Sequence, residues 1–88
     1  MTIKFSRQFK KQYKKLSPRL KNKTKQRIEL WKEDPANSLL RTHRLTGKLS
    51  SYHSINITGD IRALYEIIGD EMYLYDLIGT HAQLYGQD

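Results

Sequence analysis

The 88 residues of this chain include 16 Lys and Arg against nine Asp and Glu, a net charge of +7, and no cysteine. This length suffices for one domain only, which we predict to span residues 1–88. The lack of cysteine excludes a disulfide framework and a thiolate zinc site. No apolar run is long enough for a signal peptide or a membrane span, so we expect a soluble cytoplasmic protein without a membrane partner.

The charge is unevenly distributed along the chain. Residues 1–48 hold 15 basic against three acidic residues, a net +12, whereas residues 49–88 hold one basic against six acidic residues, a net −5. Lysine is an ordinary residue of solvated helix surfaces, and this explanation suffices for "KKQYKK" taken alone. Over the whole basic half, a charge of +12 favours binding to a polyanion or to an acidic partner.

Two helices are predicted in the basic half, after a short strand. Residues 2–5, "TIKF", alternate in polarity and favour an extended strand. Ser6 and Ser17 are suited to cap the two helices that follow over residues 6–33. Pro35 ends the second helix because a proline disfavours helical geometry in the residue before it. Residues at helical spacing predict one buried face on each helix: Phe9, Tyr13, Leu16, Leu20, Thr24, Ile28 and Trp31.

After Pro35 the apolar pattern changes to the alternation of β-strands. Residues 51–57, 61–68 and 72–78 are rich in β-branched and aromatic side chains, and the turn-forming "TGD" and "GDE" separate them. They predict a three-stranded antiparallel meander, preceded by a loop over 37–50 with at most one short element. The order β-α-α-β-β-β predicts an α+β fold with two N-terminal helices packed on one face of a twisted antiparallel sheet. The other face is then partly solvated and can carry a site.

The sequence lacks the usual signatures of metal and nucleophile sites. The spacing of His43, His53 and His81 matches no zinc motif. Neither a Ser-His-Asp pattern nor a glycine-rich phosphate loop is present. We therefore predict neither a metal ion nor a cofactor.

A different set of polar residues remains as a candidate site. The connector contributes His43, the start of the second meander strand contributes Asp60 and Arg62, and the residues after the third strand contribute His81 and Tyr85. In an antiparallel meander, the start of the second strand and the end of the third lie at the same end of the sheet. Strand direction alone therefore predicts that Asp60, Arg62 and His81 lie near one another.

These residue types suit RNA cleavage without a metal ion. That reaction needs a base for the ribose 2′-hydroxyl, an acid for the leaving 5′-oxygen and cations for the phosphate. Histidine serves as acid or base near neutral pH, arginine grips phosphate with two parallel donors, and an aromatic ring stacks on a base. Each residue also has a structural explanation. Arg62 can pair with Glu66, Asp60 can be a turn residue, His43 can be solvated, and His81 can cap a final helical turn within "GTHAQLYG".

Three segments resemble the RelE/ParE toxin superfamily, most closely its YafQ-like branch. "HRLTG" (43–47) matches the branch pattern H-x-L-x-G, and "GTHAQLY" (79–85) matches the ending G-T-H-x-x-L-F with tyrosine for phenylalanine. "RALY" (62–65) is similar to the R-L-V-Y of other RelE members. The basic first helix also fits the family, so the resemblance covers nearly the entire chain.

The resemblance implies the same β-α-α-β-β-β fold and the toxin of a type II toxin–antitoxin system that cleaves mRNA in the ribosomal A site without a metal ion. Its implied partners are the ribosome, mRNA and a cognate antitoxin that binds it in a hetero-oligomer. It makes His43 and His81 catalytic or phosphate-contacting residues. It likewise makes Asp60 a site aspartate, Arg62 a phosphate-binding residue and Tyr85 a site aromatic. The basic residues expected to contact RNA are Lys10, Lys11, Lys14, Lys15, Arg41, Arg44 and Lys48.

Departures from the branch pattern leave two other functions open. Asn56 stands where the branch has a strand histidine, and His53, three residues earlier, falls on the opposite face of that strand. Leu77 stands where the branch often has an arginine, and Ile61 where it often has an aromatic residue. One alternative is a ParE-like toxin that binds DNA gyrase without cleaving RNA. The other is a decayed toxin that only binds nucleic acid.

Overall fold

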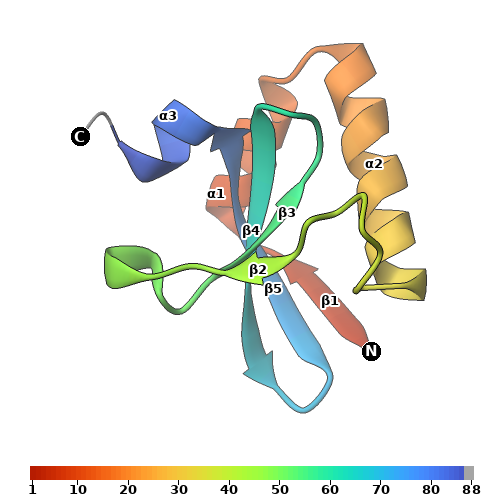
Figure 1. Ribbon diagram of the computed structural model, residues 1–88. Coiled ribbons are helices and arrows are strands. Elements are labelled where there is room, and N and C mark those ends of the chain that lie inside the picture. The colour runs from red at the N-terminus through yellow and green to blue at the C-terminus, as the bar shows by residue number, and fades with distance from the viewer. Residues whose placement is uncertain (87–88) are drawn as a thin grey trace.

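A five-stranded sheet carries two helices on one face and a short third helix on the other (Figure 1). The computed structural model describes residues 1–86. In chain order the elements are β1 (Thr2–Phe5), α1 (Arg7–Lys14), α2 (Pro18–Glu33), β2 (His43–Arg44), the 3₁₀ helix η1 (Gly47–Leu49), β3 (His53–Asn56), β4 (Ile61–Gly69), β5 (Met72–Thr80) and α3 (His81–Tyr85).

The strand order is β1-β5-β4-β3-β2. Strands β2 to β5 pair antiparallel, which confirms the predicted meander, whereas β1 pairs with β5 in parallel. The predicted α+β fold is therefore confirmed with one refinement, because the sheet is mixed rather than wholly antiparallel. Tight turns force the meander strands to alternate in direction. No such turn joins β1 to β5, so the turn residues did not reveal its direction.

The helix boundaries follow from their capping residues. The Ser6 hydroxyl accepts the Phe9 N–H at 3.0 Å, and the Ser17 hydroxyl accepts the Leu20 N–H at 3.3 Å. Both predicted N-caps are thus confirmed, and α2 ends two residues before Pro35, as expected. Within residues 1–86, none of the helices combines the length and apolar character needed to cross a membrane.

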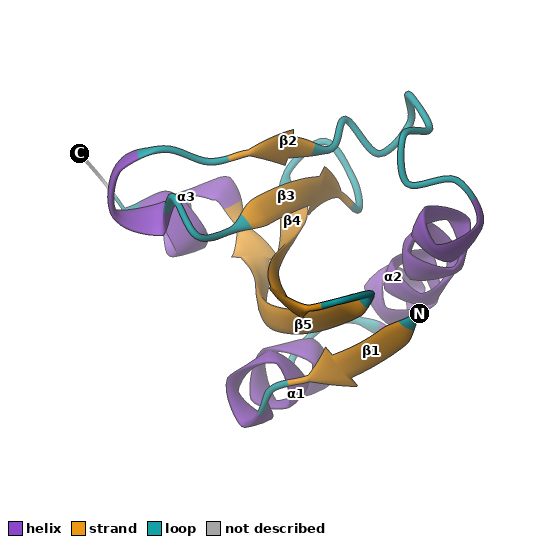
Figure 2. Ribbon diagram, turned by 90° about the horizontal axis from the view of Figure 1, so that it is seen from below, coloured by secondary structure: helices purple, strands orange, loops and turns teal. Residues whose placement is uncertain are grey.

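The core lies between the sheet and the helices α1 and α2 (Figure 2). Trp31 on α2 is 1% exposed and meets the rings of Tyr65, Tyr73 and Tyr75 edge-on, at centroid distances of 5.0, 5.0 and 5.4 Å. Phe9 attaches α1 to the same cluster through Tyr75, at 5.9 Å. All the residues predicted to form the inward faces of the two helices are buried or half-buried, which confirms that prediction.

The connector between α2 and β3 is more ordered than predicted, since it contains both β2 and η1. Leu40 within it is fully buried, and its carbonyl accepts the Asn56 N–H at 2.8 Å. This bond ties the connector to the end of β3. The adjacent Leu39 is 60% exposed. The local sequence pattern did not indicate which of these two leucines would be buried.

Candidate functional site

The register of the sheet brings the predicted site residues onto the face that α1 and α2 leave open. Residues paired directly across neighbouring strands present their side chains on the same face. One row across the sheet consists of His43, Ser54, Leu64 and Leu77. The next row consists of Asn56, Arg62 and Gly79.

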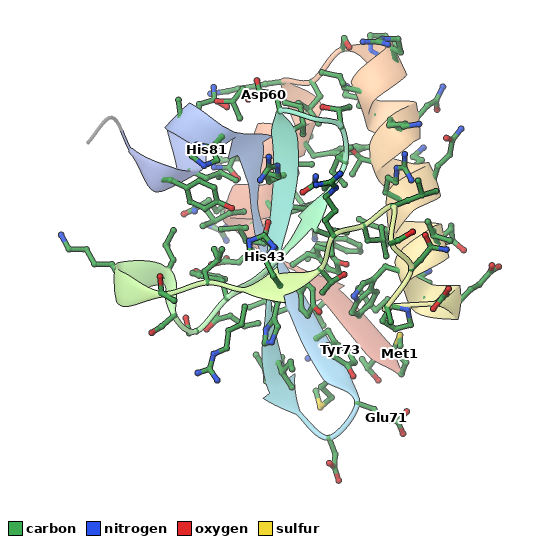
Figure 3. All side chains as sticks on the ribbon, in the orientation of Figure 1. Met1, His43, Asp60, Glu71, Tyr73 and His81 are labelled. Atoms are coloured by element: carbon green, nitrogen blue, oxygen red, sulfur yellow. The ribbon has the colours of Figure 1, made fainter. Side chains whose placement is uncertain are left out.

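A groove of about 520 Å³ lies over these rows. The segment containing β2 and η1 forms one wall of the groove, α3 forms the other wall, and β4 forms part of the floor. Figure 3 shows His43 on the first wall and His81 on the second. The lining residues are His43, Leu45, Thr46, Lys48, Leu49, Arg62, His81 and Tyr85. Four of the five predicted catalytic residues therefore meet in one groove.

Asp60 is the fifth predicted catalytic residue, and its exposed side chain does not line the groove. It lies in the turn before β4 (Figure 3), where its backbone carbonyl accepts the His81 N–H at 3.1 Å. Strand direction thus correctly predicted that Asp60 and His81 lie at the same end of the sheet. The contact that joins them is made by the Asp60 backbone.

A capping box holds α3, and with it His81, against the sheet. The Thr80 hydroxyl accepts the Gln83 N–H at 3.1 Å, and the Gln83 side-chain oxygen accepts the Thr80 N–H at 2.8 Å. A Cβ at Gly79 would lie only 2.8 Å from that Gln83 oxygen, which explains the glycine. The helical-turn explanation of "GTHAQLYG" is therefore right about the helix, with Thr80 rather than His81 as its N-cap.

Tyr85 connects α3 to the floor of the groove. Its hydroxyl donates to the Ser54 hydroxyl at 3.3 Å. Its ring meets the His81 ring edge-on, with centroids 4.3 Å apart and an interplanar angle of 77°. The His81 ring is therefore positioned by packing and stays exposed on its other sides.

Arg62 is half-buried and lacks an opposite charge. Its Nη2 donates to the Gly59 carbonyl at 3.0 Å, and no carboxylate among residues 1–86, Glu66 included, forms an ion pair with it. The Nε of Arg62 and the Oδ1 of Asn56, its cross-strand partner, are both buried without a hydrogen-bond partner in the described part of the chain. Buried polar atoms nearly always have partners, and this pair offers one donor, Arg62 Nε, and one acceptor, Asn56 Oδ1, so it suits a polar ligand that can both accept and donate.

The predicted RNA-binding residues divide between two layers of the molecule. Lys48 lines the groove, whereas Arg44 pairs across the sheet with His53, on the side opposite the groove, and donates from Nε to the Ser50 carbonyl at 3.1 Å. The lysines of α1 and its C-cap lie with the helical layer on the other side of the sheet (Figure 2): Lys10, Lys11, Lys14 and Lys15. A single strand in the groove would therefore not reach both groups. Within residues 1–86, no three His, Asp or Glu side chains are grouped to hold a metal ion.

His53 lies on the helix-facing side of the sheet, opposite the groove. It pairs across the sheet with Tyr65 and stacks on that ring, with centroids 5.3 Å apart. Burial, and secondarily the charge of Arg44, lowers the pKa of His53 from its ordinary value of 6.5. The folded protein therefore holds this proton less tightly than the unfolded chain does. The free energy of unfolding is therefore unaffected by His53 above pH 6.5. It decreases as the pH falls from 6.5 toward the lower pKa of the folded state, because the unfolded chain takes up the proton first.

Replacing His53 by phenylalanine is expected to flatten the acid side of the stability profile. The H53F variant keeps a ring to stack on Tyr65 and removes the group that titrates. Between about pH 7 and pH 5, its melting temperature should fall less than that of the wild type. Thermal unfolding followed by circular dichroism at each pH measures this, and equal falls in both proteins would contradict it.

The comparisons with known proteins agree with this architecture. Residues 1–86 match the family model described as the bacterial toxin of type II toxin–antitoxin systems, YafQ. The crystal structure of YafQ from E. coli strain BL21(DE3) has 27% sequence identity and a TM-score of 0.81, with 96% of this chain and 97% of that chain covered. YafQ in the E. coli DinJ–YafQ toxin–antitoxin complex has 28% identity and a TM-score of 0.79, with 96% of each chain covered.

A more distant structure has the same fold. The YoeB/ParE toxin from Agrobacterium tumefaciens is 21% identical, with a TM-score of 0.76 over 92% of this chain and 99% of that one. A comparison with curated proteins gave no match. Since the YafQ model covers residues 1–86, this chain belongs to the YafQ family of bacterial toxins of type II toxin–antitoxin systems.

Proposed function

We propose that this toxin is a ribosome-dependent mRNA endonuclease that cuts in the ribosomal A site. The observation that carries the proposal is the meeting of His43, Arg62, His81 and Tyr85, from three separate elements, in one groove. Two histidines beside an arginine can supply an acid, a base and a phosphate ligand. Membership of the YafQ family supports the same activity.

In the proposed reaction, one histidine removes the proton of a ribose 2′-hydroxyl, and that oxygen attacks the adjacent phosphorus. The P–O5′ bond breaks, the other histidine protonates the departing 5′-oxygen, and a 2′,3′-cyclic phosphate remains. Arg62 donates to the non-bridging phosphate oxygens as negative charge develops on them. Two histidines suffice for both proton transfers, since one proton is removed and one is returned.

The remaining predicted residues have supporting roles in this proposal. The Tyr85 ring stacks on a base beside the scissile phosphate, and Lys48 and Arg41 contact the backbone of the bound strand. Arg44, which pairs with His53 on the other side of the sheet, suits ribosomal RNA instead. The lysines of the helical layer suit ribosomal RNA. Asp60 belongs to the site through its contact with the His81 backbone.

The proposed antitoxin contact lies on the helical layer, away from the groove that holds the histidines. A second groove, of about 690 Å³, runs between α1 and α2. Its apolar lining includes Phe5, Phe9, Tyr13 and Ile28. The rim holds four lysines (Lys10, Lys14, Lys25 and Lys32) and one acid, Glu29, which pairs with Lys32 at 2.8 Å and leaves the rim basic overall. An apolar floor with a basic rim complements a segment that is apolar on one face and acidic on the other. We therefore propose that an acidic amphipathic segment of the cognate antitoxin binds here, as the E. coli relative is known in complex with its antitoxin DinJ.

Charge reversal at the rim is expected to weaken antitoxin binding. The K10E/K14E double variant changes two lysines that line this groove, and K11E/K15E makes the same charge change at neighbouring positions outside it. K10E/K14E should raise the dissociation constant by about tenfold or more, and K11E/K15E by clearly less. Calorimetric titration with the purified antitoxin measures both. Equal losses would indicate a long-range charge effect and contradict a docked segment.

Induction of the toxin without its antitoxin tests the proposed activity against its alternatives. We expect growth arrest and cuts in cellular mRNA that keep a fixed phase relative to codons, since cleavage occurs in the A site. Primer extension on cellular transcripts detects such cuts. Intact mRNA with DNA damage would instead support a gyrase-binding toxin, and normal growth would support a decayed one.

A further inference from the structure

His43 makes one side-chain hydrogen bond that fixes how its ring can react. Its Nδ1 lies 2.9 Å from the carbonyl oxygen of Arg41. A carbonyl oxygen only accepts hydrogen bonds, so Nδ1 must carry the proton. In a neutral imidazole, Nε2 is then the unprotonated nitrogen, with a lone pair free to accept a proton.

The carbonyl that makes this bond belongs to a residue in an unusual conformation. Arg41 has a φ of +46°, in the left-handed region that residues other than glycine rarely adopt. Such a conformation is energetically unfavourable for a residue with a side chain and persists only where its surroundings enforce it. We therefore expect contacts next to Arg41 in the chain to hold this conformation.

Contacts on both sides of Arg41 enforce that conformation. Leu40 is fully buried, and its carbonyl accepts the Asn56 N–H at 2.8 Å. On the other side, the Thr42 hydroxyl donates to the Pro35 carbonyl at 2.9 Å. Held between these two anchors, the Arg41 peptide is turned so that its carbonyl oxygen reaches the His43 ring.

His81 has no comparable restraint. Among residues 1–86, no hydrogen-bond partner holds either ring nitrogen of His81, and the ring is positioned by its edge-on contact with Tyr85. The two histidines of the groove therefore differ. One is restricted to a single neutral tautomer, and the other is free to exchange protons at either nitrogen.

We infer that Arg41 is a positioning residue whose left-handed backbone locks His43 in the Nδ1–H tautomer, so that Nε2 of His43 is the proton acceptor in the groove. If the proposed nuclease function is correct, on which this role rests, His43 is the base for the 2′-hydroxyl. His81 is then the acid for the 5′-oxygen. The guanidinium of Arg41 is not needed for the lock, because the backbone carbonyl makes the bond.

Two substitutions of Arg41 separate its backbone from its charge. Both R41N and R41V remove the guanidinium. Asparagine tolerates the left-handed region, whereas valine, which is β-branched, strongly disfavours it. R41N should therefore keep the lock and R41V should lose it, although the change in charge is the same.

The ¹⁵N chemical shifts of the His43 ring, recorded at about pH 8 where histidine is neutral, report the tautomer directly. We expect a protonated Nδ1 and an unprotonated Nε2 in the wild type and in R41N, and a mixture in R41V. In RNA cleavage, R41V should lower kcat by about tenfold or more relative to R41N, because the base spends less time in its reactive form. R41N should act mainly on KM, through the lost charge.

The wild-type spectrum alone can overturn the inference, since an Nε2–H tautomer at His43 contradicts it whether or not R41V folds. Equal loss of kcat in R41N and R41V would also overturn the proposed role of the backbone. If the wild-type tautomer is as inferred but the toxin cleaves no RNA, the proposed nuclease function fails and the locked tautomer stands.

Discussion

Replacing His81 by alanine is expected to lower RNA cleavage by about 100-fold or more, because one of the two proposed proton-transfer groups is lost. Its side chain is exposed and makes no hydrogen bond in the described part of the chain. The melting temperature should therefore hardly change, since exposed substitutions of this kind usually alter stability by less than about 0.5 kcal/mol. Single-turnover cleavage assays with saturating toxin measure the loss in the chemical step.

Tyr85→Phe provides a matched control for His81→Ala. It keeps the ring that packs edge-on against His81 and removes only the hydroxyl that donates to Ser54. Its cleavage rate should stay much closer to that of the wild type than the rate of H81A. An H81A variant that folds normally and cleaves at the wild-type rate would remove His81 from the proposed mechanism.

The largest loss of stability is expected from Trp31→Ala. Trp31 is 1% exposed and is the ring around which Tyr65, Tyr73 and Tyr75 pack. Replacing such a buried aromatic residue by alanine leaves a cavity and typically costs about 3–5 kcal/mol. Since small domains are stable by only about 5–15 kcal/mol, W31A should lose a large fraction of its stability and unfold at a much lower urea concentration than the wild type.

Urea denaturation of W31A and W31F measures this contribution. Trp31 is the single tryptophan of the chain, so both variants need circular dichroism rather than tryptophan fluorescence as the probe. Phenylalanine retains an aromatic ring and should lose clearly less stability than alanine does. Similar losses in both variants would show that the edge-on contacts of the indole, rather than the filling of the core, dominate at this position.

The elements that local patterns control were predictable from the sequence. Ser6 and Ser17 cap their helices as expected, and the turn-forming residues between 57 and 72 gave an antiparallel meander. Strand direction was enough to bring Arg62 and His81 to the same end of the sheet. His53 was correctly assigned to the face opposite that of Asn56, because the two lie three residues apart and side chains alternate between the faces along a strand.

The features that depend on tertiary contacts were not predictable from local patterns. The parallel pairing of β1 and the β2–β3 ladder join segments without a tight turn between them. The left-handed conformation of Arg41 is not signalled by a glycine or asparagine at that position. It is enforced by the neighbouring Leu40, whose carbonyl bonds to Asn56 on β3, a strand that lies later in the sequence. For Asp60, the sequence suggested a side-chain role, whereas the contact in the structure comes from its carbonyl.

The central claim is that this toxin cleaves mRNA on the ribosome with the residues of one groove. The most direct test adds the purified protein to an in vitro translation reaction, maps the 5′ ends of the fragments, and repeats the assay on the same mRNA without ribosomes. We predict cuts in the codon of the A site with ribosomes, little cleavage without them, and loss of these cuts in H81A. Intact mRNA in the presence of translating ribosomes, with a toxin shown to be folded, would contradict the claim.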